Sequence, residues 1–207
     1  GDFSDANVGA GDFVISEQAL EALGDSANVI LEATNNITVN DITDNAIDLA
    51  ATTGSLTMTA DSDGDGSGVI AFADTADAFN TQGGNITLTT AGGFTLGTFN
   101  TNGGDFAINR SADAAIDIGD DNGAGFVLDN ATLSRISADE LRVNITTGAT
   151  VDGLDTTGNA VTLFRLEASG VSPIDFSGDA STIDSEFRIT HIGGAVNVNV
   201  DLTTTGD

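Results

Sequence analysis

The stretch Asn80-Thr-Gln-Gly-Gly-Asn-Ile-Thr-Leu88 decides the fold, because close copies of it return at a fixed step. Twenty residues later the chain reads Asn100-Thr-Asn-Gly-Gly-Asp-Phe-Ala-Ile108, and after another twenty it reads Asp120-Asp-Asn-Gly-Ala-Gly-Phe-Val-Leu128. In all three copies glycine stands at the fourth position, and apolar residues stand at the seventh and ninth. A repeat this short is the signature of a solenoid, in which each copy forms one coil.

Short segments of alternating apolar and polar residues fill most of the chain, as expected of half-buried strands separated by turns. These segments span 28–34, 36–40, 55–59, 69–72, 85–89, 94–99, 105–109, 115–118, 126–128, 132–136, 140–145, 149–151, 160–167, 186–192 and 195–202. One segment differs. Residues 16–23 begin with Ser16 as an N-cap and end before Gly24, which predicts a two-turn helix with Leu20 and Leu23 facing inward.

Together these patterns predict an all-β fold, a parallel β-helix (β-solenoid) with coils of about 20 residues and one short helix near residues 16–23. Residues 1–207 then form a single β-solenoid section. Equivalent positions stack about 4.8 Å apart, which predicts two inner ladders: Ile86 with Phe106 and Phe126, and Leu88 with Ile108 and Leu128. An antiparallel sandwich of short strands is the alternative, but it gives no reason for a fixed repeat.

The charge balance excludes several classes of function. The chain carries 32 Asp and Glu against 5 Lys and Arg, all five of them arginine, for a formal charge of −27. Nucleic acid and anionic lipid surfaces attract basic proteins, so neither is expected as a partner. No apolar run is long enough to span a membrane. Cysteine is absent and histidine occurs once, which leaves few groups for nucleophilic or acid–base chemistry.

The sharpest local motif is Asp61-Ser-Asp-Gly-Asp-Gly66. Carboxylates at loop positions one, three and five, with glycine at six, match the first half of an EF-hand calcium loop. Asp61, Asp63 and Asp65 are therefore the candidate metal ligands, and calcium is the candidate cofactor. The twelfth position is Phe72 instead of glutamate, so Asp74 or a neighbouring coil would have to complete the site. The alternative is a solvated acidic bulge at a corner.

Other polar residues give weaker signals. A second acidic turn contains Asp117, Asp120, Asp121 and Asn122, but it lacks the alternating spacing of a calcium loop. The nearest carboxylate pairs are Asp139 with Glu140 and Asp184 with Glu186, and paired carboxylates can hydrolyse sugars. Neighbouring strand residues face opposite sides of a sheet, however, so these pairs alone do not predict an enzyme. His191 lies within an expected strand, which favours a solvent-facing or stacked histidine over a metal ligand.

Three stretches resemble the repeat regions of very large filamentous-haemagglutinin-like proteins of bacterial surfaces. They are Phe13-Val-Ile-Ser-Glu-Gln-Ala-Leu-Glu-Ala-Leu23, Ala27-Asn-Val-Ile-Leu-Glu-Ala-Thr-Asn-Asn-Ile-Thr-Val-Asn-Asp41 and Thr53-Gly-Ser-Leu-Thr-Met-Thr-Ala-Asp-Ser-Asp-Gly-Asp-Gly-Ser-Gly68. The resemblance covers residues 10–130 well and the remainder only in style. It implies a right-handed β-helix, secretion through an outer-membrane partner, and a role in adhesion or fibre formation.

The expected function is a non-catalytic extracellular structural or adhesive β-solenoid, an internal section of a long surface adhesin or fibre. The expected partner is the chain itself, by head-to-tail stacking or tandem repetition, with strands near 195–202 meeting strands near 8–15 of the next unit. This follows because an uncapped solenoid end is an unpaired sheet edge. The alternatives are a calcium-dependent binding module of a secreted exoprotein, with calcium or a host receptor as ligand, and a polysaccharide-active enzyme.

Overall fold

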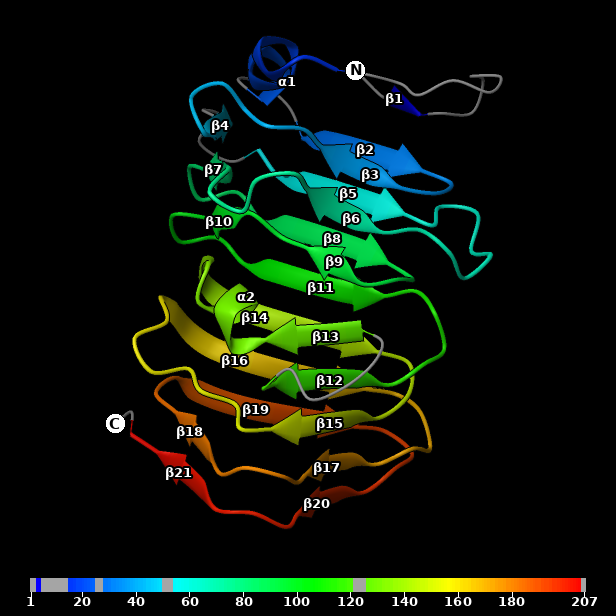
Figure 1. The fold of residues 1–207 in the computed structure, drawn as a ribbon, viewed down its shortest axis with the longest axis vertical. Coiled ribbons are helices and arrows are strands. Elements are labelled where there is room, and N and C mark those ends of the chain that lie inside the picture. Colours follow the sequence, from blue (N-terminus) through cyan, green and yellow to red (C-terminus); the bar gives the residue numbers. More distant parts are fainter. Residues whose placement is uncertain (1–2, 5–14, 25–27, 50–53, 121–125, 206–207) are drawn as a thin grey trace.

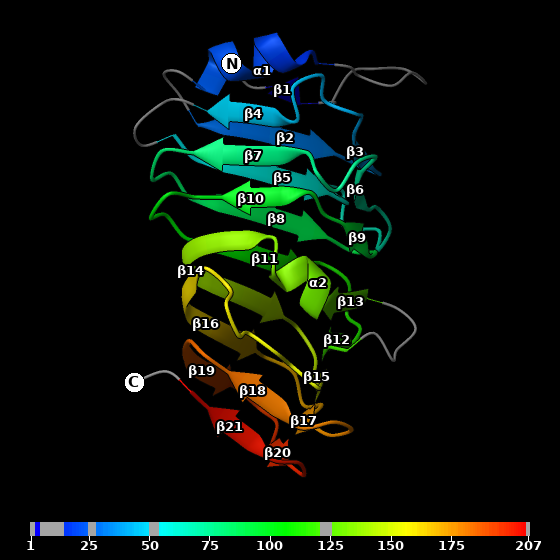
Figure 2. The same cartoon turned by 60° about the vertical axis from the view of Figure 1, so that its left-hand side comes forward.

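The chain forms stacked parallel strands in sheets that curl around one long axis (Figures 1 and 2). The computed structural model describes residues 3–4, 15–24, 28–49, 54–120 and 126–205. Every strand pair among these residues is parallel, as the sequence predicts. At the level of its sheets this arrangement fits a β-solenoid. We call one passage of the chain through the successive sheets a coil.

The largest sheet has two arms that meet on the long strand β14. The C-terminal half of β14 pairs with β11, and its N-terminal half pairs with β10. One arm runs through β1 (Phe3–Ser4), β2 (Val29–Ala33), β5 (Leu56–Ala60), β8 (Ile86–Thr90) and β11 (Phe106–Arg110) to β14 (Ile136–Ile145). The sheet then continues beyond β14 with β16 (Val161–Ala168) and β19 (Glu186–His191). The other arm comprises β4 (Ala46–Leu49), β7 (Ala78–Thr81) and β10 (Thr98–Asn100).

Three smaller sheets complete the coils. One contains β3 (Ile37–Val39), β6 (Ile70–Phe72) and β9 (Phe94–Thr95). The next contains, in spatial order, β13 (Phe126–Asp129), β12 (Ile116–Gly119), β15 (Ala149–Asp152), β17 (Ile174–Phe176) and β20 (Val196–Val198). The last pairs β18 (Ser181–Ile183) with β21 (Leu202–Thr204).

Alternation along the strands places one apolar column inside the stack. Ile86 pairs with Phe106, and Leu88 pairs with Ile108, so the first step of each predicted ladder is confirmed. All four side chains are fully buried. The buried apolar residues form one continuous cluster that reaches from the first helix to β18. The core is therefore a column that runs the length of the stack.

The repeated Asn-Thr-x-Gly-Gly turn has a physical explanation in the stacking of coils. The buried hydroxyl of Thr81 donates to the carbonyl of Gly84 at 2.6 Å, and Thr101 donates to Gly104 at 2.5 Å. A Cβ on Gly104 would lie 2.5 Å from the carbonyl oxygen of Gly84, and a Cβ on Gly84 would overlap the carbonyl of Gly54. The threonine closes the turn from inside, and the second glycine lets one turn rest on the turn before it.

The third copy of the repeat does not continue the ladder, and this part of the prediction is wrong. Phe106 pairs with Leu141 instead of Phe126, so the step is 20 residues once and 35 residues the next time. Phe126 pairs with Ile116, which precedes it by only ten residues. Phe126 and Leu128 are still buried, but they lie in another sheet. A fixed coil length of about 20 residues therefore holds only locally.

Residues 132–136 were expected to form a strand, and this prediction is also wrong at its start. Asn130–Leu133 form a short helix, α2. The carboxylate of Asp129 caps it by accepting the N–H of Thr132 at 2.6 Å. An aspartate before Asn-Ala-Thr-Leu is a helix-start signal that the strand pattern concealed. The next strand, β14, begins at Ile136.

The predicted N-terminal helix is confirmed as α1 (Glu17–Gly24). Ser16 accepts the N–H of Ala19 at 3.3 Å, which fits its predicted role as N-cap. Leu20 is buried, whereas the side chain of Leu23 lies outside the described part of the chain. Glu21 accepts the N–H of Asp48 on β4 at 3.2 Å. The helix therefore lies over an edge strand at the N-terminal end of the stack (Figure 1).

Candidate functional site

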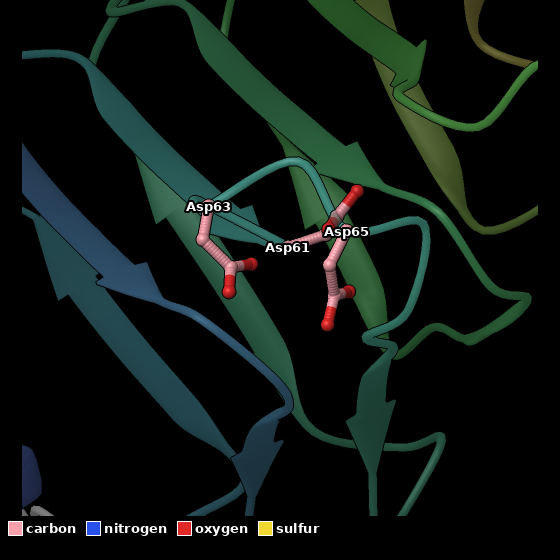
Figure 3. Close-up of side chains that lie close together, drawn as sticks. All are labelled: Asp61, Asp63 and Asp65. Carbon is pink, nitrogen blue, oxygen red and sulfur yellow. The ribbon is translucent and has the colours of Figure 1, made fainter.

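The three predicted metal ligands come together in the loop between β5 and β6 (Figure 3). One carboxylate oxygen from each of Asp61, Asp63 and Asp65 lies within 4.8 Å of the others. Asp61 is buried, whereas Asp63 and Asp65 are exposed. Hard cations such as Ca²⁺ prefer clustered carboxylate oxygens of this kind. The arrangement offers three anionic ligands on one side of a corner.

Asp61 is held by both of its carboxylate oxygens. Oδ1 accepts the N–H of Gly66 at 3.0 Å, which closes the loop on itself. Oδ2 accepts the hydroxyl of Ser111 at 2.7 Å, and Ser111 follows β11 two coils further along the stack. The sequence motif alone did not reveal this long-range contact. It fixes the loop against the body of the molecule.

The rest of the loop follows from turn chemistry. Gly64 and Gly66 have φ values of +71° and +85°, a region in which side chains are strained. Asp65 accepts both the hydroxyl and the N–H of Ser67, at 2.5 and 2.9 Å. These hydrogen bonds, the hydroxyl first, hold the pKa of the Asp65 carboxyl below its usual value. Asp65 therefore stays ionised, as a cation ligand must.

The missing bidentate ligand is not supplied from within the motif. Phe72, at the twelfth position, is a buried residue of β6 that packs against Phe79 at 5.6 Å between ring centroids. Asp74 accepts the N–H of Ala76 at 2.8 Å and is not a member of the carboxylate cluster. A bound cation would therefore have to complete its coordination with water or backbone oxygens.

The second acidic turn does not gather its carboxylates in the described residues. Asp120 accepts the side-chain amide of Asn130 at 3.0 Å, which ties the end of β12 to α2. Asp117 lies on β12 opposite Thr150. Asp121 and Asn122 lie outside the described residues. Asp120 therefore has a structural role in joining β12 to α2.

Three of the four carboxylates considered for sugar hydrolysis are held in ion pairs or hydrogen bonds, and the fourth, Asp139, is an exposed residue of β14. Glu140 contacts Arg142 at 2.6 Å and Arg165 at 3.1 Å, so two guanidinium groups hold it. Glu186 contacts Arg188 at 2.5 Å. Asp184 accepts the hydroxyl of Thr205 at 2.8 Å. These contacts hold the carboxylates in ion pairs and hydrogen bonds on the surface of the strands.

Three arginines form a column that the sequence reasoning missed. Arg142, Arg165 and Arg188 stand opposite one another on β14, β16 and β19. Glutamates before and after them in the same strands neutralise the column, as in the 3.5 Å contact between Arg165 and Glu167. The sequence does carry a signal for this column, because the three arginines repeat at a step of 23 residues, as do Phe164 and Phe187.

His191 has backbone partners. Its Nε2 lies 3.0 Å from the carbonyl oxygen of Gly170, and its Nδ1 lies 3.1 Å from that of Ala195. A neutral imidazole can donate only one of these hydrogen bonds, whereas the protonated ring donates both. The ring also occupies the space beside Gly194, where a Cβ would collide with it. These contacts give His191 a structural role at the turn after β19.

Two further charged groups are shielded from solvent, Asp77 as a buried residue and Arg110 as a half-buried one. Asp77 is fully buried, and burial raises its pKa, although the N–H of Ile42 donates to its carboxylate at 3.3 Å. Arg110 lies with its guanidinium carbon 4.5 Å from the centre of the Phe126 ring, and burial lowers its pKa. Both groups join neighbouring elements of the stack, since Ile42 precedes β4 and Phe126 begins β13.

Neither helix in the described part of the chain has the length and apolar character needed to cross a membrane. The comparisons with known proteins give no relative from which a role could be transferred. No protein-family model, curated protein or solved structure matches this chain.

Proposed function

We propose that the chain is a non-catalytic structural section of an extracellular adhesin or surface fibre, built by stacking coils. The observation that carries the proposal is the uninterrupted parallel ladder from β2 to β19 over one buried apolar column. The strand pairs in such a stack link each coil only to its neighbours, so the length of the molecule can be extended without redesigning its core. The proposal includes association with further copies of the chain at the ends of the stack.

We further propose that the coils wind in the right-handed sense. Connections between parallel strands of one sheet are right-handed in nearly all proteins, because the strand twist favours that return path. The short corners support a regular winding, since β8 and β9 are separated only by residues 91–93. An experimental electron density map would decide the handedness directly.

The surface location can be tested on intact cells of the source organism. Antibodies raised against the folded chain should label unpermeabilised cells in immunogold microscopy. Cells from which the coding sequence has been deleted provide the control. Labelling that requires permeabilisation would contradict the proposal. Incubation of the pure chain with a panel of polysaccharides should release no reducing ends, and release would support the enzyme hypothesis instead.

Calcium binding is the second candidate function, and the carboxylate cluster of Asp61, Asp63 and Asp65 favours it. A cation there would offset the mutual repulsion of three carboxylates at the corner. It would also hold the loop to β11 through Asp61 and Ser111, whose contact is already formed. Isothermal titration with CaCl₂ tests this proposal, with MgCl₂ as the comparison. Absence of heat for both ions would contradict it.

A further inference from the structure

The chain contains several Asn-x-Ser/Thr sequons, the three-residue signal for attachment of an N-linked sugar. They begin at Asn36, Asn85, Asn109, Asn130 and Asn144. Each sequon offers two groups to an enzyme: the asparagine Nδ2, which takes the sugar, and the hydroxyl two residues later, which completes the signal. The sequons therefore differ in function if these groups are free in some of them and hydrogen-bonded in others.

The Nδ2 groups of three sequons hold the stack together. The Nδ2 of Asn109 donates to the hydroxyl of Thr89 at 3.2 Å, and the Nδ2 of Asn144 donates to Oδ1 of Asn109 at 2.7 Å. The Nδ2 of Asn130 donates to the carbonyl of Gly153 at 2.9 Å. All three asparagines are half-buried. An enzyme would have to release these amides from their hydrogen bonds before it could add a sugar.

The hydroxyls of the same three sequons are also engaged or buried. Ser111 donates to the carboxylate of Asp61 at 2.7 Å. Thr146 donates to the carboxylate of Asp113 at 3.3 Å. Thr132 is a buried residue of α2. Neither half of the acceptor signal is therefore free in these sequons once the chain has folded.

The amides of Asn36 and Asn85 are arranged differently. Both residues are exposed and stand immediately before a strand, β3 and β8 in Figure 1. Oδ1 of Asn36 accepts the N–H of Val69 at 3.0 Å, and Oδ1 of Asn85 accepts the N–H of Asp105 at 2.9 Å. Their Nδ2 groups have no hydrogen-bond partner among the described residues. A sugar on Nδ2 leaves Oδ1 in place as an acceptor, so the link to the next coil survives.

The hydroxyls of these two sequons are free as well. Thr38 is exposed on β3, and Thr87 is half-buried on the outer face of β8, between two buried residues. Neither hydroxyl has a hydrogen-bond partner in the part of the chain that the structure describes. Both halves of the acceptor signal are thus open to an enzyme in the folded molecule.

We infer that Asn36 and Asn85 are acceptor sites for an N-linked sugar, whereas the other three sequons serve the stack. In the transfer, the asparagine Nδ2 attacks the anomeric carbon of a glycosyl diphosphate. A C–N bond forms, and the bond from the anomeric carbon to the diphosphate oxygen breaks. The diphosphate leaves with the electron pair of that bond, and Nδ2 releases one proton. The inference does not depend on the proposed structural role of the chain.

Sugar transfer to the folded chain tests the inference. The pure chain is incubated with a soluble asparagine glycosyltransferase and UDP-glucose, and the occupied sites are mapped by peptide mass spectrometry. Short peptides carrying each sequon are the control for the preference of the enzyme. Relative to those peptides, occupancy at Asn36 and Asn85 should exceed that at the other three asparagines by about tenfold, because the latter must first break a hydrogen bond. Equal relative occupancy at all sequons, or no transfer to Asn36 and Asn85 while their peptides react, would overturn the inference.

Loss of the hydroxyl should remove each site without changing its asparagine. Thr38→Val should abolish transfer to Asn36 and leave Asn85 occupied, whereas Thr87→Val should do the reverse. Both substitutions keep the shape of a β-branched side chain on the strand. Transfer that persists in these variants would show that the sugar is not attached through the sequon.

Asn28 allows the converse test, in which a site is created. It is exposed and its Oδ1 accepts the N–H of Ser55 at 3.1 Å, as in the two acceptor asparagines, but Ile30 stands where the hydroxyl is required. Ile30 is itself 42% exposed, so Ile30→Thr should leave the fold intact, which a circular dichroism spectrum checks. The variant should accept a third sugar, at Asn28. A folded variant without that sugar would contradict the geometric reason given for Asn36 and Asn85.

Discussion

The stretch from 78 to 110 and the stretch from 111 to 135 carry copies of the same sequence repeat but fold differently. In the first, the turns at Thr81–Gly84 and Thr101–Gly104 stack directly, and Ile86 pairs with Phe106. In the second, β13 pairs with β12 of the same passage, and a helix follows. A repeat in sequence is thus a repeat in structure only where every residue required by the stacking turn is present.

The third copy of the repeat differs from the first two at two positions whose role in the stacked turn the structure explains. Asp121 stands where Thr81 and Thr101 donate a buried hydroxyl, and a carboxylate has no proton to donate at neutral pH. Ala124 stands where Gly84 and Gly104 have no room for a Cβ. These two differences remove the residues that the stacked turn requires, while the apolar positions of the repeat are kept. Apolar periodicity alone therefore overestimated the length of the regular stretch.

The largest expected effect comes from the core of the regular stretch. Phe106→Ala should lower the free energy of unfolding by roughly 3–5 kcal/mol, because it opens a cavity at a fully buried position. Urea denaturation measures this change. In double-mutant cycles, Phe106→Ala should couple more strongly to Leu141→Ala than to Phe126→Ala, since Leu141 is its partner in the ladder. Stronger coupling to Phe126 would restore the 20-residue register and contradict the structure.

A smaller loss is expected where the two turns touch. Gly104→Ala places a Cβ against the carbonyl of Gly84 and should cost about 3 kcal/mol, the upper range for overpacking. Gly103→Ala is the neighbouring control. A Cβ at position 103 would have open space around it, so Gly103→Ala should cost only the backbone strain of a φ of +99°, about 1 kcal/mol. Equal losses for the two variants would show that the turns are not in close contact.

The buried hydroxyl gives the next smaller effect. Thr101→Val keeps the shape of the side chain but removes the donor to Gly104, and it should cost about 1 kcal/mol. The carbonyl of Gly104 keeps the N–H of Asp139 as a second partner, which limits the loss. Thr87→Val on the outer face of β8 should change stability by less than about 0.5 kcal/mol. Thermal unfolding followed by circular dichroism compares the two variants.

The smallest effect distinguishes the carboxylate loop at Asp61–Asp65, which precedes the regular stretch, from the acidic turn of the second stretch. Millimolar calcium should raise the melting temperature by a few degrees, by mass action on the folded state. Asp63→Asn should abolish that shift, because Asp63 belongs to the carboxylate cluster. Asp117→Asn in the second acidic turn should leave it unchanged. If calcium and chelator give the same melting temperature for the unaltered chain, the calcium proposal is wrong.

Local sequence patterns predicted more of the structure than the assumption of a fixed 20-residue coil did. Alternation predicted most strands, the repeat predicted their parallel stacking, and Ser16 and Gly24 predicted the helix α1 within a residue of its limits. The Asp-x-Asp-x-Asp spacing brought its three carboxylates together as expected. What could not be predicted depends on contacts between distant coils, such as Ser111 with Asp61. The arginine column could have been predicted, since its step of 23 residues is visible once the search for a step of 20 is abandoned.

The corner between β5 and β6 has a consequence for how the molecule can vary. The connection from Ala60 to Ile70 is longer than the equivalent connection from Thr90 to Phe94, yet the strands on both sides keep their partners. The exposed residues 62–67 stand outside the buried column, so packing of the core does not restrict them, whereas Asp61 and Gly68 on either side are buried. A peptide inserted between Ser62 and Gly66 would therefore be displayed outside the stack, and it would separate the carboxylates of Asp63 and Asp65 from that of Asp61.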